Sequence, residues 1–379
     1  MIRQAIFVTD LFLSLAALVI HFQTSDASKL QTVATFQKNQ PTGVAVSREG
    51  RVFVNFPRWS DQHEFSVVEV LPDGGVKPYP DRQWNSWNQE SQGVPASQAF
   101  VCVQSVWVDD DNMLWILDPA APYLEQVVPG GPKLVKVNLA TNKVDKVISF
   151  DETIAPQRSY LNDVRIDTNR DYAYITESGL GAIIAVNLES GKARRLLADH
   201  PSTKAEPNVT ITVKGKQLRD QSGKTPQFNA DGIALSKDGE YLYYHALTGK
   251  TLYRIKTDLL RNEQASPQEL ASGVEKVAET VVTDGMLIDD RNNVYHTALE
   301  QDAIVYLTPD KQMKTLVKDE KISWPDSMAF GRNSPSSGEL YFTTSQIQNM
   351  PRFNQGKETR SEPYHVFKTK LPRGETAMR

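Results

Sequence analysis

Six stretches of the chain share one order of hydrophobic and polar positions. Each begins with a polar residue, continues as a short apolar strand, passes through a polar turn and ends in a second strand that carries an aromatic residue. The stretches are TGVAVSREGRVFVNF from Thr42, QSVWVDDDNMLWILD from Gln104, NDVRIDTNRDYAYITE from Asn162, DGIALSKDGEYLYYH from Asp231, DGMLIDDRNNVYHT from Asp284 and DSMAFGRNSPSSGELYFT from Asp326. The opening residue precedes the aromatic by eleven or twelve positions in five stretches, and the insertion NSPSS lengthens the sixth.

Each stretch reads as a β-hairpin, because both halves alternate apolar and polar residues around a turn rich in Gly, Asp and Asn. A further strand follows most copies, as in GAIIAVNLESGKARRLL and DAIVYLTPDKQMKTLV. Units of about four strands that recur every forty to seventy residues are typical of propeller blades. The pattern therefore predicts an all-β, six-bladed β-propeller with four-stranded antiparallel blades, formed as a single domain by residues 29–379.

Two segments, 78–100 and 198–229, are too long to be simple turns between blades. Loops of this length often act as lids or binding loops. The second contains VTITVKGKQL, which predicts a hairpin of its own. Aromatic residues in loops could wall a pocket, although some of them would simply pack; they are Trp59, Trp84, Trp87 and Tyr123.

Composition narrows the class of protein. A net charge of −4, with no long basic run, argues against nucleic acid as a partner. Cys102 is the only cysteine, so an internal disulfide is excluded, and its apolar surroundings predict a buried structural thiol.

The first 28 residues have the outline of an export signal. Arg3 precedes an apolar run from Leu11 to Ile20, and small residues follow at Ala27 and Ser28, although Asp10 is unfavourable for a signal. We expect a cleaved signal in preference to an uncleaved anchor, with a buried first strand as the alternative. The mature protein would be secreted or periplasmic, without a membrane span.

The opening residue of each stretch is the candidate for chemistry, because the innermost strand of a blade starts at the mouth of the central channel. Asp231, Asp284 and Asp326 supply carboxylates from successive blades, beside the amides of Asn162 and Gln104. Carboxylates this close raise one another's pKa unless a cation compensates them. Two kinds of cation fit: Ca²⁺ or Mg²⁺, which prefer oxygen ligands, or the protonated amine of an organic ligand. The alternative is that each residue only bonds nearby backbone.

Two histidines follow the aromatics of the fourth and fifth stretches. His245 aligns with Asn55, Thr176, Thr297 and Thr343, whereas His296 stands one position earlier and should face the other side of its strand. We expect at most one of them to reach the channel, and His245 is the candidate ligand-binding residue. Packing within the sheet is the alternative for each.

Several segments resemble the yellow / major royal jelly protein family. They are DYAYITESGLGAIIAVNLESGKARRLLADHPST, DGIALSKDGEYLYYHALTGKTLYRI, DDDNMLWILDPA and TTSQIQNMPRFNQG, and the resemblance covers most of residues 35–370. It implies a six-bladed propeller, usually secreted, from a family that includes binders of small amines and proteins linked to pigment chemistry. Animal members typically carry disulfides, so this chain is more similar to the microbial members.

A more distant similarity is to the gluconolactonase and senescence marker protein propellers, which hold a divalent metal over the channel. That resemblance implies metal ligands at Asn162 and Asp231 and a catalytic role for Asp284. The family's first-blade Glu falls on Thr42, and Asp326 could replace the missing carboxylate.

Two functions follow. The first is an exported propeller that binds a small organic ligand, an amine or an aromatic molecule, at the channel mouth. Its binding residues would be Asp231, Asp284, Asp326, Asn162, Gln104 and His245. The second is a divalent-metal-dependent hydrolase of lactones or esters, in which Asp284 activates water and the metal is held by Asn162, Asp231, Asp284 and Asp326. Whether the protein is an enzyme stays open, and a scaffold for another protein is a third possibility.

Overall fold

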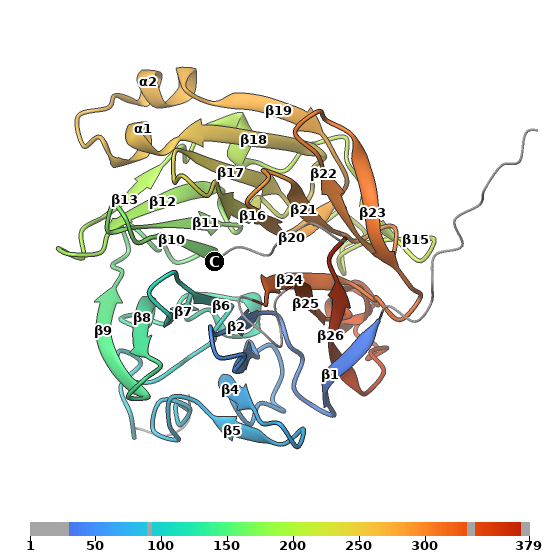
Figure 1. Ribbon diagram of the computed structural model, residues 1–379. Coiled ribbons are helices and arrows are strands. Elements are labelled where there is room, and N and C mark those ends of the chain that lie inside the picture. The colour runs from blue at the N-terminus through green and yellow to red at the C-terminus, as the bar shows by residue number, and fades with distance from the viewer. Residues whose placement is uncertain (1–29, 89–92, 332–337, 373–379) are drawn as a thin grey trace, which may run out of the picture.

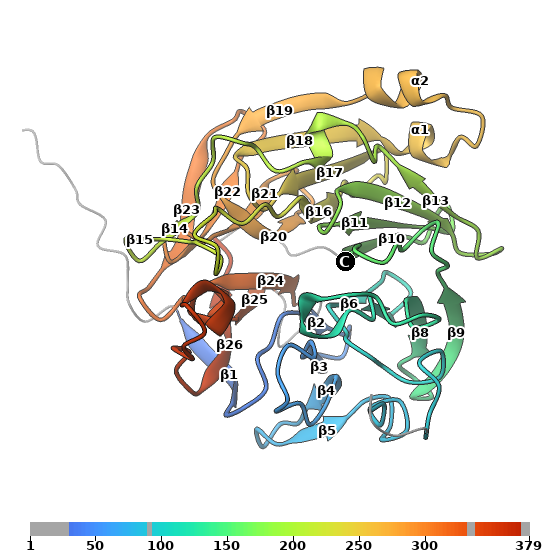
Figure 2. The same ribbon diagram turned by 180° about the vertical axis from the view of Figure 1, so that it is seen from behind.

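The computed structural model describes residues 30–88, 93–331 and 338–372, which form a six-bladed β-propeller (Figures 1 and 2). Six four-stranded antiparallel sheets surround a central axis, as predicted. Blade one contains β2 (Val44–Val46), β3 (Val52–Asn55), β4 (Val67–Val70) and β5 (Val76–Pro78). Blade two contains β6 (Ser105–Val108), β7 (Met113–Asp118), β8 (Lys133–Asn138) and β9 (Lys143–Ser149). Blade three contains β10 (Leu161–Asp167), β11 (Tyr172–Glu177), β12 (Ala182–Asn187) and β13 (Ala193–Leu196).

The second half of the ring repeats this arrangement. Blade four contains β16 (Ala230–Leu235), β17 (Tyr241–Ala246), β18 (Thr251–Lys256) and β19 (Glu275–Glu279). Blade five contains β20 (Thr283–Ile288), β21 (Val294–Ala298), β22 (Ala303–Leu307) and β23 (Met313–Lys318). Blade six contains β24 (Pro325–Phe330), β25 (Glu339–Thr344), β26 (Tyr364–Lys370) and β1 (Gln31–Phe36).

Short elements decorate the blades. The helices α1 (Thr257–Arg261) and α2 (Pro267–Ser272) lie between β18 and β19, and α2 starts at a capping box formed by Ser266. The predicted extra hairpin is present as β14 (Thr212–Val213) and β15 (Lys216–Gln217). The 3₁₀ turns are η2 (Pro122–Leu124), η3 (Pro201–Thr203), η4 (Ile347–Asn349) and η5 (Pro351–Phe353).

Blade six closes the ring with strands from distant parts of the sequence. β1 pairs with β26, so that Gln31 lies opposite Lys368. Phe36 of β1 then packs edge-on against Phe56 of blade one, with ring centroids 4.9 Å apart. Closure covers the edge strand that an open sheet would leave exposed.

Apolar clusters between neighbouring blades form the core. Trp115 and Leu117 of blade two, for example, share a cluster with Val164 and Ile175 of blade three. Cys102 is fully buried, and burial raises the pKa of its thiol to about 12, which fits the predicted structural role. In the described ranges, no helix is long and apolar enough to cross a membrane. The predicted export signal at 1–28 lies outside the residues described.

Irregular pairing recurs at the same place on four inner strands. The register shifts between Leu161 and Val164 of β10, and the matching shifts in β16, β20 and β24 fall at residues 230–233, 283–286 and 325–328. A bulge re-aims side chains and bends the strand. In each strand the irregular stretch contains the residue that opens the sequence repeat, so the bulges present those residues at one end of the channel.

The glycine after two of these aspartates has a steric cause. A Cβ on Gly232 would lie 2.6 Å from the carbonyl oxygen of Asp284 in the next blade, and a Cβ on Gly285 would overlap the carbonyl oxygen of Asp326. Inner strands therefore approach each other too closely there for any side chain. In each Asp-Gly pair, the aspartate supplies a carboxyl group and the glycine leaves room for the backbone of the neighbouring inner strand.

Candidate functional site

A cavity of about 210 Å³ lies at the end of the channel where the inner strands begin. Five of the six opening residues line it: Gln104, Asn162, Asp231, Asp284 and Asp326. The sixth, Thr42, is fully buried and its hydroxyl donates to the carbonyl oxygen of Gln104 at 2.9 Å. Thr42 therefore joins blade one to blade two.

Each of the three carboxyl groups has at least one protein hydrogen bond, and Asp326 Oδ1 also accepts from the hydroxyl of Ser327 at 3.3 Å. The amide nitrogen of Asn162 donates to Asp231 Oδ1, and the indole of Trp324 donates to Asp284 Oδ2 at 2.7 Å. Asp326 Oδ2 is hydrogen-bonded to the hydroxyl of Ser345 at 3.1 Å. All three aspartates are at most 5% exposed, so they face the cavity rather than bulk water.

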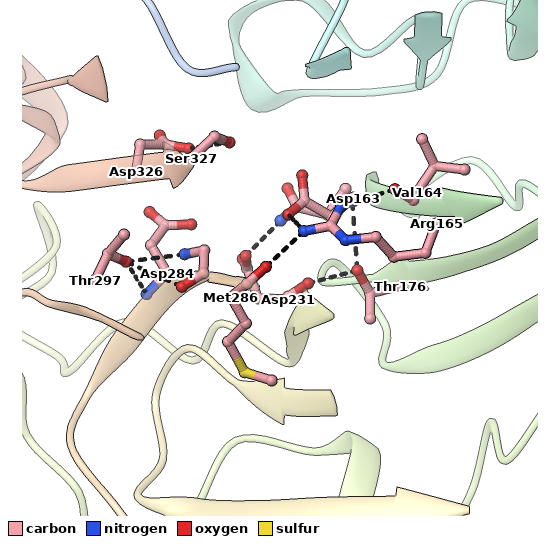
Figure 3. Close-up of polar contacts among 12 residues, drawn as sticks. Asp163, Val164, Arg165, Thr176, Asp231, Asp284, Met286, Thr297, Asp326 and Ser327 are labelled. Carbon is pink, nitrogen blue, oxygen red and sulfur yellow. Dashed lines mark hydrogen bonds and ion pairs between the residues drawn. The ribbon is translucent and has the colours of Figure 1, made fainter. Parts of the chain in front are cut away.

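The bulge backbone is held by threonines of the second strands. Thr297 Oγ1 accepts the backbone N–H of Asp284 at 3.1 Å and of Gly285 at 2.9 Å, as Figure 3 shows. Thr176 accepts the N–H of Asp163 in the same way at 3.3 Å. These bonds satisfy amides that the irregular pairing leaves without a ladder partner, and so fix the direction of the carboxyl groups.

Burial raises the pKa of all three carboxyl groups. The pKa of Asp284 rises from 3.8 to about 7, although its hydrogen bond from Trp324 opposes this. For Asp231 and Asp326, burial and then the negative charge of Asp284 raise the pKa well above the usual range. In the empty cavity, several of these groups therefore hold their protons near neutral pH.

Arg165 reaches from blade three toward Met286 of blade five (Figure 3). From β10 in blade three, its guanidinium donates to the carbonyl oxygen of Met286 in blade five at 2.6 Å and stacks over Trp107 at 4.2 Å. Its only acidic partner among the described residues is Asp163, at 3.8 Å. Arg165 also lines a second cavity at the opposite mouth. Within the described ranges, Asp231, Asp284 and Asp326 thus have no protein cation in ion-pair contact.

Loop residues build the other walls of the cavity, and most of them are apolar. They are Trp59, Leu124, Tyr160, Phe228, Leu247, Trp324, Ile347 and Phe353. Of the two long segments, 198–229 contributes Gln227 and Phe228, whereas none of the described residues of 78–100 lines the cavity.

Only Trp59 among the predicted loop aromatics lines this cavity. Trp84 packs on Phe100 with ring centroids 5.0 Å apart, and Trp87 is buried in a neighbouring cluster. Tyr123 is 38% exposed and donates to Asp61. These three aromatics therefore contact other residues of the protein and do not line the cavity.

Tyr160 is a wall residue that the sequence did not reveal. Its hydroxyl donates to Gln104 Oε1 at 2.8 Å and accepts from the indole of Trp59 at 3.0 Å. Its backbone N–H donates to the buried carboxylate of Glu177, which also pairs with Arg195. The signal was present as the acid Glu177 at the end of the mostly apolar strand YAYITE, where a buried charge requires partners.

Neither predicted histidine lines the cavity. The ring of His245 contacts Thr280 Oγ1 at 3.0 Å and the carbonyl oxygen of Ala246 at 2.7 Å. His296 is also fully buried, and the two rings meet edge-on at 6.2 Å. Burial lowers the pKa of His245 to about 4 and of His296 to about 3, so both rings are neutral. The structure thus separates His245 from the other candidate residues.

The donor set does not fit a resident divalent cation. Across residues 30–88, 93–331 and 338–372, no three His, Cys, Asp or Glu side chains are arranged to hold a metal ion. Asn162 turns its amide nitrogen toward Asp231, and Thr42 turns its hydroxyl to backbone. Calcium needs six to eight oxygen ligands. The predicted Ca²⁺ site stays a prediction without support from this geometry.

The raised pKa values predict a stability that falls as pH rises. Between pH 3.8 and about 7 the folded Asp284 keeps a proton that the unfolded chain has lost, so its contribution to stability decreases over this window and is level above it. We expect the melting temperature of the empty protein to fall from pH 4 toward pH 7 less steeply in Asp284→Asn than in the wild type. Thermal unfolding of both proteins in low salt measures this, and equal slopes would contradict the assignment.

Comparisons with known proteins agree with the fold and with one family. The family model described as major royal jelly protein matches residues 101–368. Major royal jelly protein 1 of Apis mellifera is 24% identical over 262 residues, which is 65% of this chain and 56% of that protein. The chain spans about half the length of the first curated relatives it matches.

Solved structures show the same architecture at low identity. A gluconolactonase from Xanthomonas campestris is 12% identical with a TM-score of 0.51, over 90% of this chain and 89% of that one. Regucalcin of Agrobacterium tumefaciens, described as a calcium-binding protein, is 13% identical with a TM-score of 0.50, over 92% of this chain and 96% of that one. At these identities the likeness shows the fold alone.

Proposed function

Because this chain belongs to the major royal jelly protein family, we propose that it binds a small organic molecule with a protonated amine at the mouth of its central channel. One observation carries the proposal: three buried carboxyl groups share a cavity, and no Lys or Arg among the described residues is in ion-pair contact with them. With the export segment expected at residues 1–28, we propose that this binding takes place outside the cytoplasm.

The chemistry of an ammonium group matches this site. A bound ammonium would offset the repulsion among the carboxyl groups and favour their ionised forms, so binding and loss of protons are coupled. It offers three donors, whereas Asp231 and Asp284 each have one oxygen bonded to a protein donor and Asp326 contacts the hydroxyls of Ser345 and Ser327. The aromatic walls, including Trp59 and Trp324, suit the hydrocarbon part of the ligand.

Benzylamine and benzyl alcohol provide the first test, because they have nearly the same shape and differ in charge. We expect benzylamine to bind at least about tenfold more tightly, the ratio that one charge-assisted hydrogen bond supplies. Calorimetric titration at about pH 8, where the amine is still largely protonated, measures both affinities. Equal affinities for the two molecules, or no binding of either molecule, would contradict the proposed amine binding.

The hydrolase alternative rests on Asp284 alone. A pKa of about 7 suits a general base that takes a proton from water. The metal that this chemistry needs finds no fitted donor set among the described residues. Lactone turnover that depends on both an added divalent metal and Asp284 would favour the hydrolase over the binding function.

A further inference from the structure

The cavity carries charge of the opposite sign at its open end. Arg158, which lies before β10, and Arg352 of η5 line the same cavity as the carboxyl groups, together with Glu125. Arg158 and Glu125 are exposed and Arg352 is half-buried, whereas the carboxyl groups on the inner strands are almost completely buried. The acids therefore form the floor and the two arginines belong to the rim.

Arg352 lacks the partner that other sheltered arginines have. Arg51 is paired with Glu69 at 2.6 Å and Arg195 with Glu177 at 2.5 Å. For the guanidinium of Arg352, the described part of the chain offers no carboxylate in ion-pair contact and no hydrogen-bond acceptor; the group lies 5.4 Å from the ring of Phe353. Burial lowers its pKa, which is the cost of holding this charge without a partner.

Apolar side chains form much of the remaining lining, together with Ser159, Ser178 and Gln227. Leu124, Phe228, Leu247 and Ile347 line the cavity and offer no charge. A ligand that satisfies the whole cavity must therefore carry a cation at one end, an apolar body, and an anion at the other end. An α-amino acid, with both charges on one carbon, would leave either the floor or the rim without its counter-charge.

We propose that the ligand is dipolar: its ammonium group meets Asp231, Asp284 and Asp326, and a carboxylate or similar anion at its far end meets Arg352, with Arg158 beside it. The inference rests on the proposed function and adds the class of ligand. Arginine suits this role because its planar group donates two parallel hydrogen bonds to a carboxylate. Glu125 on the same rim opposes the anion, and the charge of Asp220 also acts on Arg352, but neither acid is in ion-pair contact with its guanidinium.

Two probes separate the floor from the rim. Benzylamine carries only the amine, and 4-(aminomethyl)benzoic acid adds a carboxylate at the opposite end of the ring. We expect the acid to bind the wild-type chain about tenfold more tightly than benzylamine. In the double variant Arg158→Gln with Arg352→Gln, the ratio of the two affinities should fall to about one. The ratio reports on the carboxylate alone, because a change in the electrostatic potential at the amine affects both probes equally.

The control variant is Arg82→Gln, which removes an exposed arginine that does not line the cavity and should keep the ratio. A ratio near one in the wild type, or a ratio that survives the double variant, overturns the dipolar ligand. If benzylamine still binds and that binding needs Asp284 and Asp326, the proposed function stands without this inference. If neither probe binds, both proposals fall.

Discussion

Replacing Asp284 and Asp326 together with asparagine is expected to weaken benzylamine binding by about 100-fold, with each lost charge contributing about tenfold. Asparagine keeps the volume of each side chain and an oxygen that can accept from Trp324 or contact Ser345. What disappears is the negative charge that compensates the ammonium group. Titration calorimetry at about pH 8 measures the change in benzylamine affinity. This pH lies above the pKa of about 7 for Asp284, so that carboxyl group is ionised in the wild-type protein.

Benzyl alcohol serves as the control in the same experiment. Its affinity depends on the apolar walls, so the double variant should retain it within a few-fold. Benzylamine affinity that survives the two substitutions would show that the amine binds elsewhere. An equal loss for both molecules would point to a damaged cavity rather than to lost charge.

Lys133→Met should destabilise the protein by about 3–5 kcal/mol, the usual result of removing one partner from a buried ion pair. Lys133 and Asp118 have fully buried side chains and lie 2.9 Å apart. Nζ of Lys133 also donates to the carbonyl oxygens of Ala96 and Gly131. Without the ammonium, the Asp118 charge and two carbonyl groups would stay buried with fewer partners.

Lys136→Met is the matched control, because Lys136 lies on the same strand, β8, and forms an ion pair that water reaches. Its partner Asp145 is 3.7 Å away, and their side chains are 27% and 52% exposed. Such pairs contribute about 0–1 kcal/mol. Urea unfolding of the two variants gives the comparison, and similar losses in both would show that burial of the Lys133 pair has little energetic effect.

The floor of the cavity could be predicted from the sequence because it is repeated. The alternation of apolar residues fixed the inner strands, and the residue that opens each repeat fell at the channel mouth in five cases of six. The Asp-Gly pairs at 231 and 284 were visible as well. Their glycines are explained only by the closeness of neighbouring strands, which a linear pattern does not contain.

The walls and the rim could not be predicted, because they depend on loops that approach one another in space. Tyr160, Trp324 and Arg352 come from different connections and have no common spacing. Arg165 looked like an ordinary polar position in the alternating strand NDVRID, yet it reaches Met286 of blade five. His245 shared a repeat position with threonines, but its ring is occupied by Thr280 and backbone.

The pairing of β1 with β26 also determines when the binding site can exist. Ser345 joins the two sides of the closure, since its hydroxyl donates to the carbonyl oxygen of Pro41, 304 positions away, and contacts Asp326. Contacts between residues so distant in sequence form late and slowly in folding. A chain emerging from the ribosome should therefore acquire affinity for its ligand only after β26 is made, and a bound ligand should slow the first step of unfolding, the opening of blade six.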